Sequence, residues 1–109
     1  MAFDEGLAER LLHELRDLDA VTVKHSMGGC GVMLHGNRCF GVFGEDLVVR
    51  VGPKAYEDAL ALPNARPYDF TGRPMKGWVY VSPEGVQDDE DFKAWVARGV
   101  EFGMTLPAK

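Results

Sequence analysis

Asp69-Phe-Thr-Gly-Arg-Pro-Met-Lys-Gly-Trp-Val-Tyr-Val81 is the most informative segment of this 109-residue chain. Its Gly and Pro residues predict a tight turn, and the Trp/Val/Tyr run that follows predicts a strand over residues 77–81. Arg73 and Lys76 lie on this turn, where they could bind an acidic partner or a small anion. A hairpin connection whose Gly and Pro fix the geometry is the simpler interpretation of the same residues.

The stretch before this block predicts three strands joined by short turns. Residues 21–25 alternate apolar with polar side chains, and residues 30–35 and 38–43 flank Gly36-Asn37, a pair typical of two-residue hairpin loops. Such a loop would pair Leu34 with Cys39 and Met33 with Phe40. One face of the hairpin would then carry Cys30, Val32, Leu34, Cys39 and Phe43, and the other Met33, His35, Arg38, Phe40 and Val42.

The second of these faces is apolar enough that we expect it to be covered. We predict a homodimer through this face, or a protein partner that covers it. The candidate interaction residues are Met33, His35, Arg38 and Phe40 on the hairpin, with Arg73 and Lys76 on the later turn.

Helices and further strands complete an α+β domain. Asp4 can cap a first helix with an apolar stripe, Pro53 can start a short helix that ends by Leu62, and the acidic residues 88–91 open a last helix. Strands are expected over residues 47–51 and near 66–70. The prediction is one two-layer domain over residues 1–109, with an antiparallel sheet, helices on one face and the order α-β-β-β(-β)-α-β-β-α.

Composition limits the possible functions. The formal net charge of −5 and the pI near 5.1 oppose the phosphate backbone, so we expect no direct nucleic-acid binding. The chain has neither a leader-like apolar segment nor a run of 18 apolar residues, and its two cysteines fit a reducing compartment. We therefore expect a cytoplasmic protein that does not bind a membrane.

The series His25, Cys30, His35 and Cys39 superficially resembles a ligand set, but its spacing fits no common zinc motif. On the predicted hairpin Cys30 would lie opposite Phe43, which places the two sulfurs about 13 Å apart. We expect two buried structural cysteines, no metal and no cofactor. The glycines at positions 28, 29 and 31 precede a strand rather than a helix, which favours a bulge over a phosphate-binding loop.

No serine or cysteine has an evident neighbouring base, and the carboxylates fall at helix starts or on polar helix faces. The sequence therefore predicts a protein that is not an enzyme.

Three segments are distinctive in combination: residues 24–29 (Lys-His-Ser-Met-Gly-Gly), residues 46–53 (Asp-Leu-Val-Val-Arg-Val-Gly-Pro) with Tyr56, and residues 69–78 of the opening block. Together they resemble the N-terminal domain of the TfoX/Sxy family. The sequence departs from the family at Ser26-Met27, where Met-Phe is more common. The resemblance spans nearly the whole chain.

The resemblance implies a two-layer α+β domain and, in longer members, a regulator of natural competence that acts with the cyclic-AMP receptor protein. Those members carry a C-terminal domain, and because this chain stops at Lys109 we do not expect the activity of that second domain. The family supplies no catalytic residues. We predict a regulatory module that binds another protein; the alternatives are a small-ligand sensor near Trp78, Arg50 and Arg73, and direct DNA binding.

Overall fold

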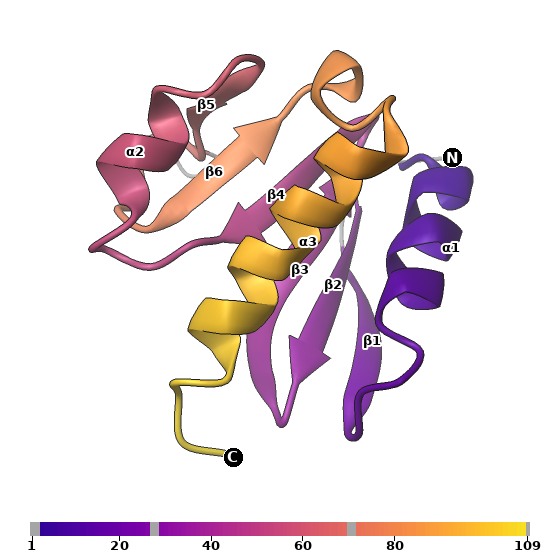
Figure 1. The fold of residues 1–109 in the computed structure, drawn as a ribbon. Helices are drawn as coiled ribbons and strands as arrows, with labels where there is room; N and C mark the ends of the chain where they lie inside the picture. The colour runs from indigo at the N-terminus through magenta and orange to yellow at the C-terminus, as the bar shows by residue number, and fades with distance from the viewer. Residues whose placement is uncertain (1–2, 27–28, 70–71, 109) are drawn as a thin grey trace.

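The computed structural model describes residues 3–26, 29–69 and 72–108. Within these residues the chain forms two layers, an antiparallel sheet and a set of helices on one of its faces (Figure 1). The strands are β1 (Val21–Ser26), β2 (Gly29–Leu34), β3 (Asn37–Phe43), β4 (Asp46–Arg50), β5 (Ala65–Pro67) and β6 (Trp78–Val81), in the spatial order β1-β2-β3-β4-β6-β5. The helices are α1 (Glu5–Glu14), α2 (Tyr56–Leu60) and α3 (Asp89–Gly103), with a 3-10 turn η1 (Pro83–Gly85) before α3. The predicted α+β architecture is confirmed.

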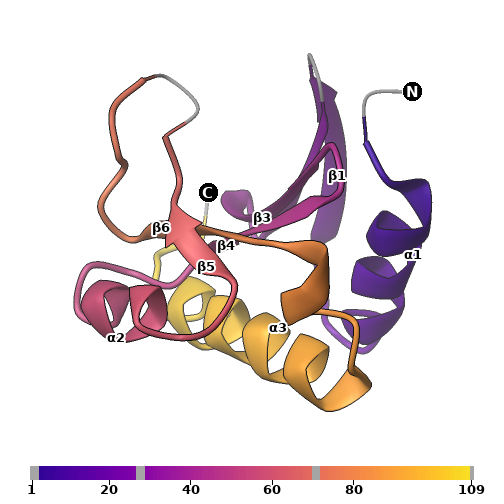
Figure 2. The same ribbon diagram turned by 90° about the horizontal axis from the view of Figure 1, so that it is seen from above.

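The helices all lie on the same side of the sheet (Figure 2). The connection between β5 and β6 and the adjoining ends of β1 and β2 project from the other side. We call the side of the sheet without helices the outer face. The outer face therefore lies between these two projecting segments, which extend beyond the plane of the strands.

Capping and apolar spacing explain where the long helices form. The Asp4 carboxylate accepts a hydrogen bond from the Leu7 amide at the start of α1, and the Asp88 carboxylate accepts one from the Glu90 amide at the start of α3. Both helices bury one stripe against the sheet. The buried side chains are Leu7, Leu11 and Leu15 from the α1 region and Phe92, Trp95 and Val96 from α3. The middle helix is shorter than predicted, because Pro53 lies in the turn before it.

The β2–β3 turn lies one residue earlier than predicted. Leu34 pairs with Asn37, so the loop consists of His35 and Gly36 rather than Gly36 and Asn37. Both loop residues have positive φ, 53° and 84°, as a type I′ turn requires. This shift alone leaves Cys39 on the same face as Leu34, as predicted, because the pairing moves by an even number of residues.

A bulge in the β2–β3 ladder reverses the rest of the predicted register. The pairing shifts between Val32 and Met33, so that Val32 lies opposite Phe40 and Cys30 opposite Val42. Phe40 and Val42 are consequently 0% exposed in the core beneath the helices. The prediction that Phe40 and Val42 lie on the second face, with Phe43 opposite, is therefore wrong.

The strand predicted near residues 66–70 is β5, which spans only Ala65–Pro67; Phe70 lies outside the described residues.

Candidate functional site: the outer face of the sheet

Strand alternation determines which side chains belong to the outer face. Leu47 and Val49 are buried in the core, so Asp46 and Val48 point to the other side, and the cross-strand pairs extend this assignment across the sheet. The outer face so defined carries Thr22, Lys24, Gly29, Gly31, Met33, Arg38, Gly41, Phe43, Asp46, Val48, Arg50, Arg66, Trp78 and Tyr80, with Tyr68 and Asp69 from the segment after β5.

Aromatic rings occupy the centre of this face. Tyr68 lies with its ring centroid 5.0 Å from Tyr80, 5.8 Å from Trp78 and 6.4 Å from Phe43. Phe43, Trp78 and Tyr80 are half-buried, whereas Val48 beneath this layer is only 1% exposed. The outer face is thus a packed aromatic layer whose upper surface remains open to solvent.

Burial raises the pKa of Tyr68 and of Tyr80 above the ordinary value of 10.0. Arg38 acts in the opposite direction on Tyr68, which places its positive charge near that ring. For Tyr80 the next contributions are the neighbouring Tyr68 and Asp69, which also raise the pKa. Both hydroxyls therefore remain neutral hydrogen-bonding groups at physiological pH.

Two of the segments behind the family resemblance meet at one end of this face. The Gly77 carbonyl accepts hydrogen bonds from the amides of Val51 (2.8 Å) and Gly52 (3.1 Å). Gly52 and Gly77 have φ of +86° and +97°, and a Cβ on Gly77 would lie 3.2 Å from the Gly52 carbonyl carbon. Both positions therefore favour glycine, and together they fix the base of the turn that carries Arg73 and Lys76.

Arginines cover the edges of the aromatic layer. The Arg66 guanidinium lies 4.6 Å from the centre of the Tyr80 ring and donates to Asp46 Oδ2 at 2.6 Å and to Ser82 Oγ at 3.1 Å. Arg50 lies at the end of the sheet between two rings, 5.2 Å from Trp78 and 5.3 Å from Phe102 of α3, and donates to the Arg38 carbonyl. These contacts hold both guanidiniums in place.

The structure brings some of the sequence-predicted interaction residues together and separates others. Met33 and Arg38 pair with each other on the outer face, and both are half-buried. Arg73 and Lys76 are exposed on the turn between β5 and β6, while His35 lies in the β2–β3 turn. Phe40 is in the core and does not belong to this group.

Sequence reasoning missed Phe43, Trp78, Tyr80, Arg66 and Lys24 as members of the outer face. The sequence predicted Trp78 in a strand and beside a candidate small-ligand site, and Arg66 only as part of a strand. The period-2 alternation of Trp78-Val-Tyr-Val81 is a signal that could have placed the two rings on one face.

Both cysteines are free and buried, as predicted. Burial raises the pKa of each thiol above 9.0, which keeps both protonated and unreactive. In the described part of the chain, no group of three or more His, Cys, Asp or Glu side chains is arranged to hold a metal ion.

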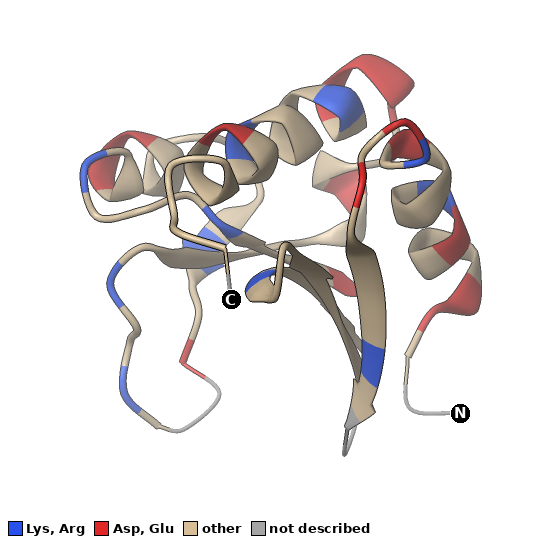
Figure 3. Ribbon diagram, turned by 90° about the horizontal axis from the view of Figure 1, so that it is seen from below, with Lys and Arg blue, Asp and Glu red and all other residues tan. Residues whose placement is uncertain are grey.

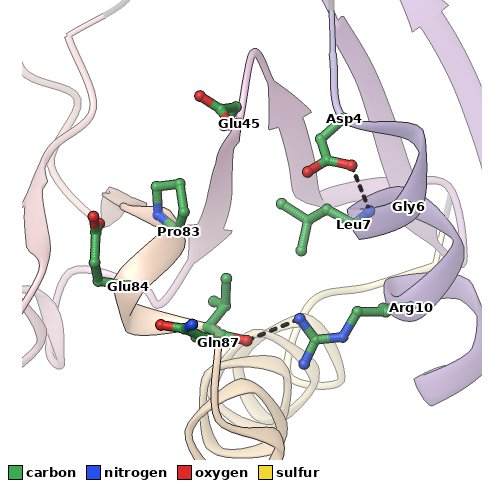
Figure 4. Close-up of a pocket in the computed structure, with 9 residues that line it drawn as sticks. Asp4, Gly6, Leu7, Arg10, Glu45, Pro83, Glu84 and Gln87 are labelled. Carbon is green, nitrogen blue, oxygen red and sulfur yellow. Dashed lines mark hydrogen bonds between the residues drawn. The ribbon is translucent and has the colours of Figure 1, made fainter.

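The helix side has its own hollows, one of which lies between α1 and η1 (Figure 4). It has a volume of about 520 Å³ and is bordered by Asp4, Glu45, Glu84 and Arg10 among others. Asp4 already caps α1, and Arg10 donates to the Val86 carbonyl at 2.9 Å and to Asp89 at 3.1 Å. Two polar groups of this cleft are therefore engaged in the fold itself, Asp4 as the cap of α1 and Arg10 in joining α1 to the start of α3.

Comparison with protein-family models gives one match, the TfoX N-terminal domain, over residues 13–103. The chain belongs to this family. Neither the comparison with curated proteins nor that with solved structures gives a match. The matched region of the TfoX N-terminal domain includes every strand of the described sheet, the turn bearing Arg73 and Lys76, and the whole of α3.

None of the described helices combines the length and the apolar composition that crossing a bilayer requires.

Proposed function

We propose that this TfoX N-terminal domain is a regulatory module that acts by binding a partner protein through its outer face, and that it catalyses no reaction. The observation that carries the proposal is the one-sided placement of the helices, which leaves the aromatic layer open to solvent (Figure 2). Half-buried Met, Phe, Trp and Tyr side chains are typical of protein-binding surfaces. The family's role in regulation agrees with an interaction of this kind.

The same surface supports the proposal of a homodimer less strongly than the sequence suggested, because Phe40 and Val42 are absent from it. Light scattering during size-exclusion chromatography measures the mass directly. A mass of about two chains at micromolar concentration is expected for a dimer, and the mass of one chain would contradict it.

The experiment that tests the proposed function compares two single substitutions that each introduce one negative charge. Met33→Glu alters the outer face, and Ala97→Glu alters the exposed side of α3. A partner identified by affinity capture from the native lysate and then purified should bind the wild type and the Ala97→Glu variant equally. Its loss from the Met33→Glu variant alone supports the proposal, whereas equal loss from both variants would contradict it.

A small-ligand sensor near Trp78, Arg50 and Arg73 is the second candidate function. The observation in its favour is the Arg50 guanidinium held against the Trp78 ring, which could present a cation beside an aromatic surface. A thermal-shift screen of nucleotides and small acids tests it. A ligand whose stabilising effect disappears in Trp78→Ala would replace the protein-binding proposal.

A further inference from the structure

Although the chain is acidic overall, its outer face and the adjoining turn carry more positive than negative charges. The net charge of the chain does not reveal this distribution. Arg50 is held at the end of the sheet between Trp78 and Phe102 and is left out of the sum. Without it, the outer face and the adjoining turn carry five cations and two carboxylates, so their formal charge is five minus two, or +3; the residues are Lys24, Arg38, Arg66, Arg73 and Lys76 with Asp46 and Asp69. Because the whole chain has a formal charge of −5, the remainder carries −8. Figure 3 shows many acidic residues along the helices, with some basic residues among them, and several basic residues on the strands and on the turn after β5.

We infer that the segment bound by the outer face is an acidic stretch of a partner protein, recognised by Lys24, Arg73 and Lys76 together with Arg38. This inference rests on the proposed function and adds the chemistry of the partner to it. A surface of charge +3 on a molecule that is otherwise −8 selects for a negative segment and orients it toward this face.

The cations of the outer face differ in whether a carboxylate of the chain already pairs with them. Arg66 is paired with Asp46 at 2.6 Å, so it contributes little to an incoming carboxylate. Lys24, Arg73 and Lys76 are exposed, and within residues 3–26, 29–69 and 72–108 their side chains form no hydrogen bond or ion pair. Lys24 comes from β1 and the other two from the turn, the two regions that project from the outer face (Figure 3). The free cations therefore flank the aromatic layer from opposite ends.

Apolar contacts would add to this charge recognition. Met75 is 38% exposed on the same turn as Arg73 and Lys76, and Met33 is half-buried beside Arg38. Methionine adapts its shape to different apolar partners. The expected segment thus combines Asp or Glu with at least one large apolar side chain, because each kind of group finds a matching neighbour here.

A nucleic acid fits these observations less well than an acidic protein segment. Nucleic-acid affinity comes from many phosphate contacts along a basic track, and among the described residues only three cations of the outer face and its turn are both exposed and unpaired. The charge of −8 on the remainder would also repel a long polyanion that extends past the face. A short acidic segment avoids this repulsion because it ends at the edge of the sheet.

The test uses the full chain and three fluorescent probes: a 15-residue peptide alternating Glu with Leu and Ala, the same peptide with Gln in place of Glu, and a 15-nucleotide single-stranded DNA. Fluorescence anisotropy at 50 and 300 mM NaCl measures binding. The Glu peptide should bind about tenfold more tightly than the Gln peptide at low salt, and this advantage should shrink at high salt. Equal binding of the two peptides would overturn the inference, as would binding of DNA alone.

Matched double variants locate the binding surface. Arg73→Glu/Lys76→Glu reverses two free cations of the turn, and Lys54→Glu/Lys93→Glu makes the same charge change on the helix side, where both lysines are exposed. The first should weaken binding of the Glu peptide about tenfold and the second by less than about twofold. An equal effect of both variants would overturn the inference, and thermal unfolding of each variant shows whether it is folded.

Failure of this inference can be told apart from failure of the proposed function. A captured partner that is lost from Met33→Glu but retained by Arg73→Glu/Lys76→Glu would leave the outer face as the binding site and exclude acidic recognition. The measured mass of the protein could instead increase with its concentration, and Arg73→Glu/Lys76→Glu could abolish this increase. This result would show that the outer face binds the acidic helix side of another copy of the chain. It would overturn the inference that the partner is a different protein.

Discussion

The Arg38 side chain lies across Gly31 on the outer face, where a Cβ on Gly31 would be 3.0 Å from Arg38 Nε and 3.1 Å from Cζ. Because Gly31 has no side chain, the guanidinium can lie close to the sheet at this position. Arg38 is thereby held half-buried near the Tyr68 ring rather than extended into solvent. This relationship connects a strand glycine to the position of a charge that the proposed partner would meet.

Gly31→Ala should move the Arg38 side chain with little loss of stability. The methyl group would meet the flexible end of an arginine rather than backbone, so we expect the free energy of unfolding to change by no more than about 1 kcal/mol. The Arg38 side-chain resonances should shift in NMR spectra, and affinity for the Glu peptide should change. Unchanged Arg38 resonances would contradict the contact.

The bulge between β2 and β3 predicts opposite outcomes for Phe40 and Met33. Phe40→Ala should cost about 3–5 kcal/mol of unfolding free energy, because it removes a ring that is 0% exposed beneath α3. Met33→Ala, on the half-buried outer face, should cost clearly less. Urea unfolding of the two variants measures both values. Equal costs, or a larger cost for Met33→Ala, would contradict the observed pairing and favour the register without the bulge.

The bulge also shows why the sequence predicted the elements of the fold better than the faces of the hairpin. Alternation and turn residues are local, and they placed the capped helices, the turn and every described strand except β5 to within one residue, whereas β5 is shorter than predicted. Both registers put apolar side chains inward, however, so local pattern alone could not choose between them. The choice depends on α3, where Gly99 and Gly103 leave room for the Phe40 ring and the Cys39 sulfur about 60 residues away in the chain.

The candidate site was predictable in part for a similar reason. Arg73 and Lys76 lie on a turn that the sequence marks clearly, and Met33 and Arg38 were assigned to the correct face. The net charge of −5 concealed the basic surface, since a sum over the chain carries no information about which strands become neighbours. Lys24 and Arg66 lie on the same face because the strands are arranged in the order β1-β2-β3-β4-β6-β5.

Neither cysteine should react rapidly in the native protein. Cys30 and Cys39 are 1% and 0% exposed, and burial raises the pKa of both thiols, so little thiolate is available at pH 8. A titration with a thiol-reactive disulfide reagent should show two slow thiols in native buffer and two fast thiols in urea. Rapid reaction of both in native buffer would contradict the packing of α1 and α3 over the sheet.

Tyr80 should contribute to a loss of stability at alkaline pH. Burial, with help from Tyr68 and Asp69, raises its pKa in the folded state above 10.0, so the unfolded chain releases this proton first as the pH rises. The stabilisation that the neutral phenol provides is therefore complete below about pH 10 and is lost as the pH rises toward the folded-state pKa.

Tyr80→Phe keeps the ring beneath Arg66 and removes the ionising group. Urea unfolding at pH 8 and pH 11 should show a smaller drop for Tyr80→Phe than for the wild type, and since both proteins contain the same cysteines, their difference reports Tyr80 together with its interaction with Tyr68. An identical drop in the two proteins would mean that the Tyr80 hydroxyl is as well solvated in the folded state as in the unfolded chain, which is incompatible with its place in the aromatic layer.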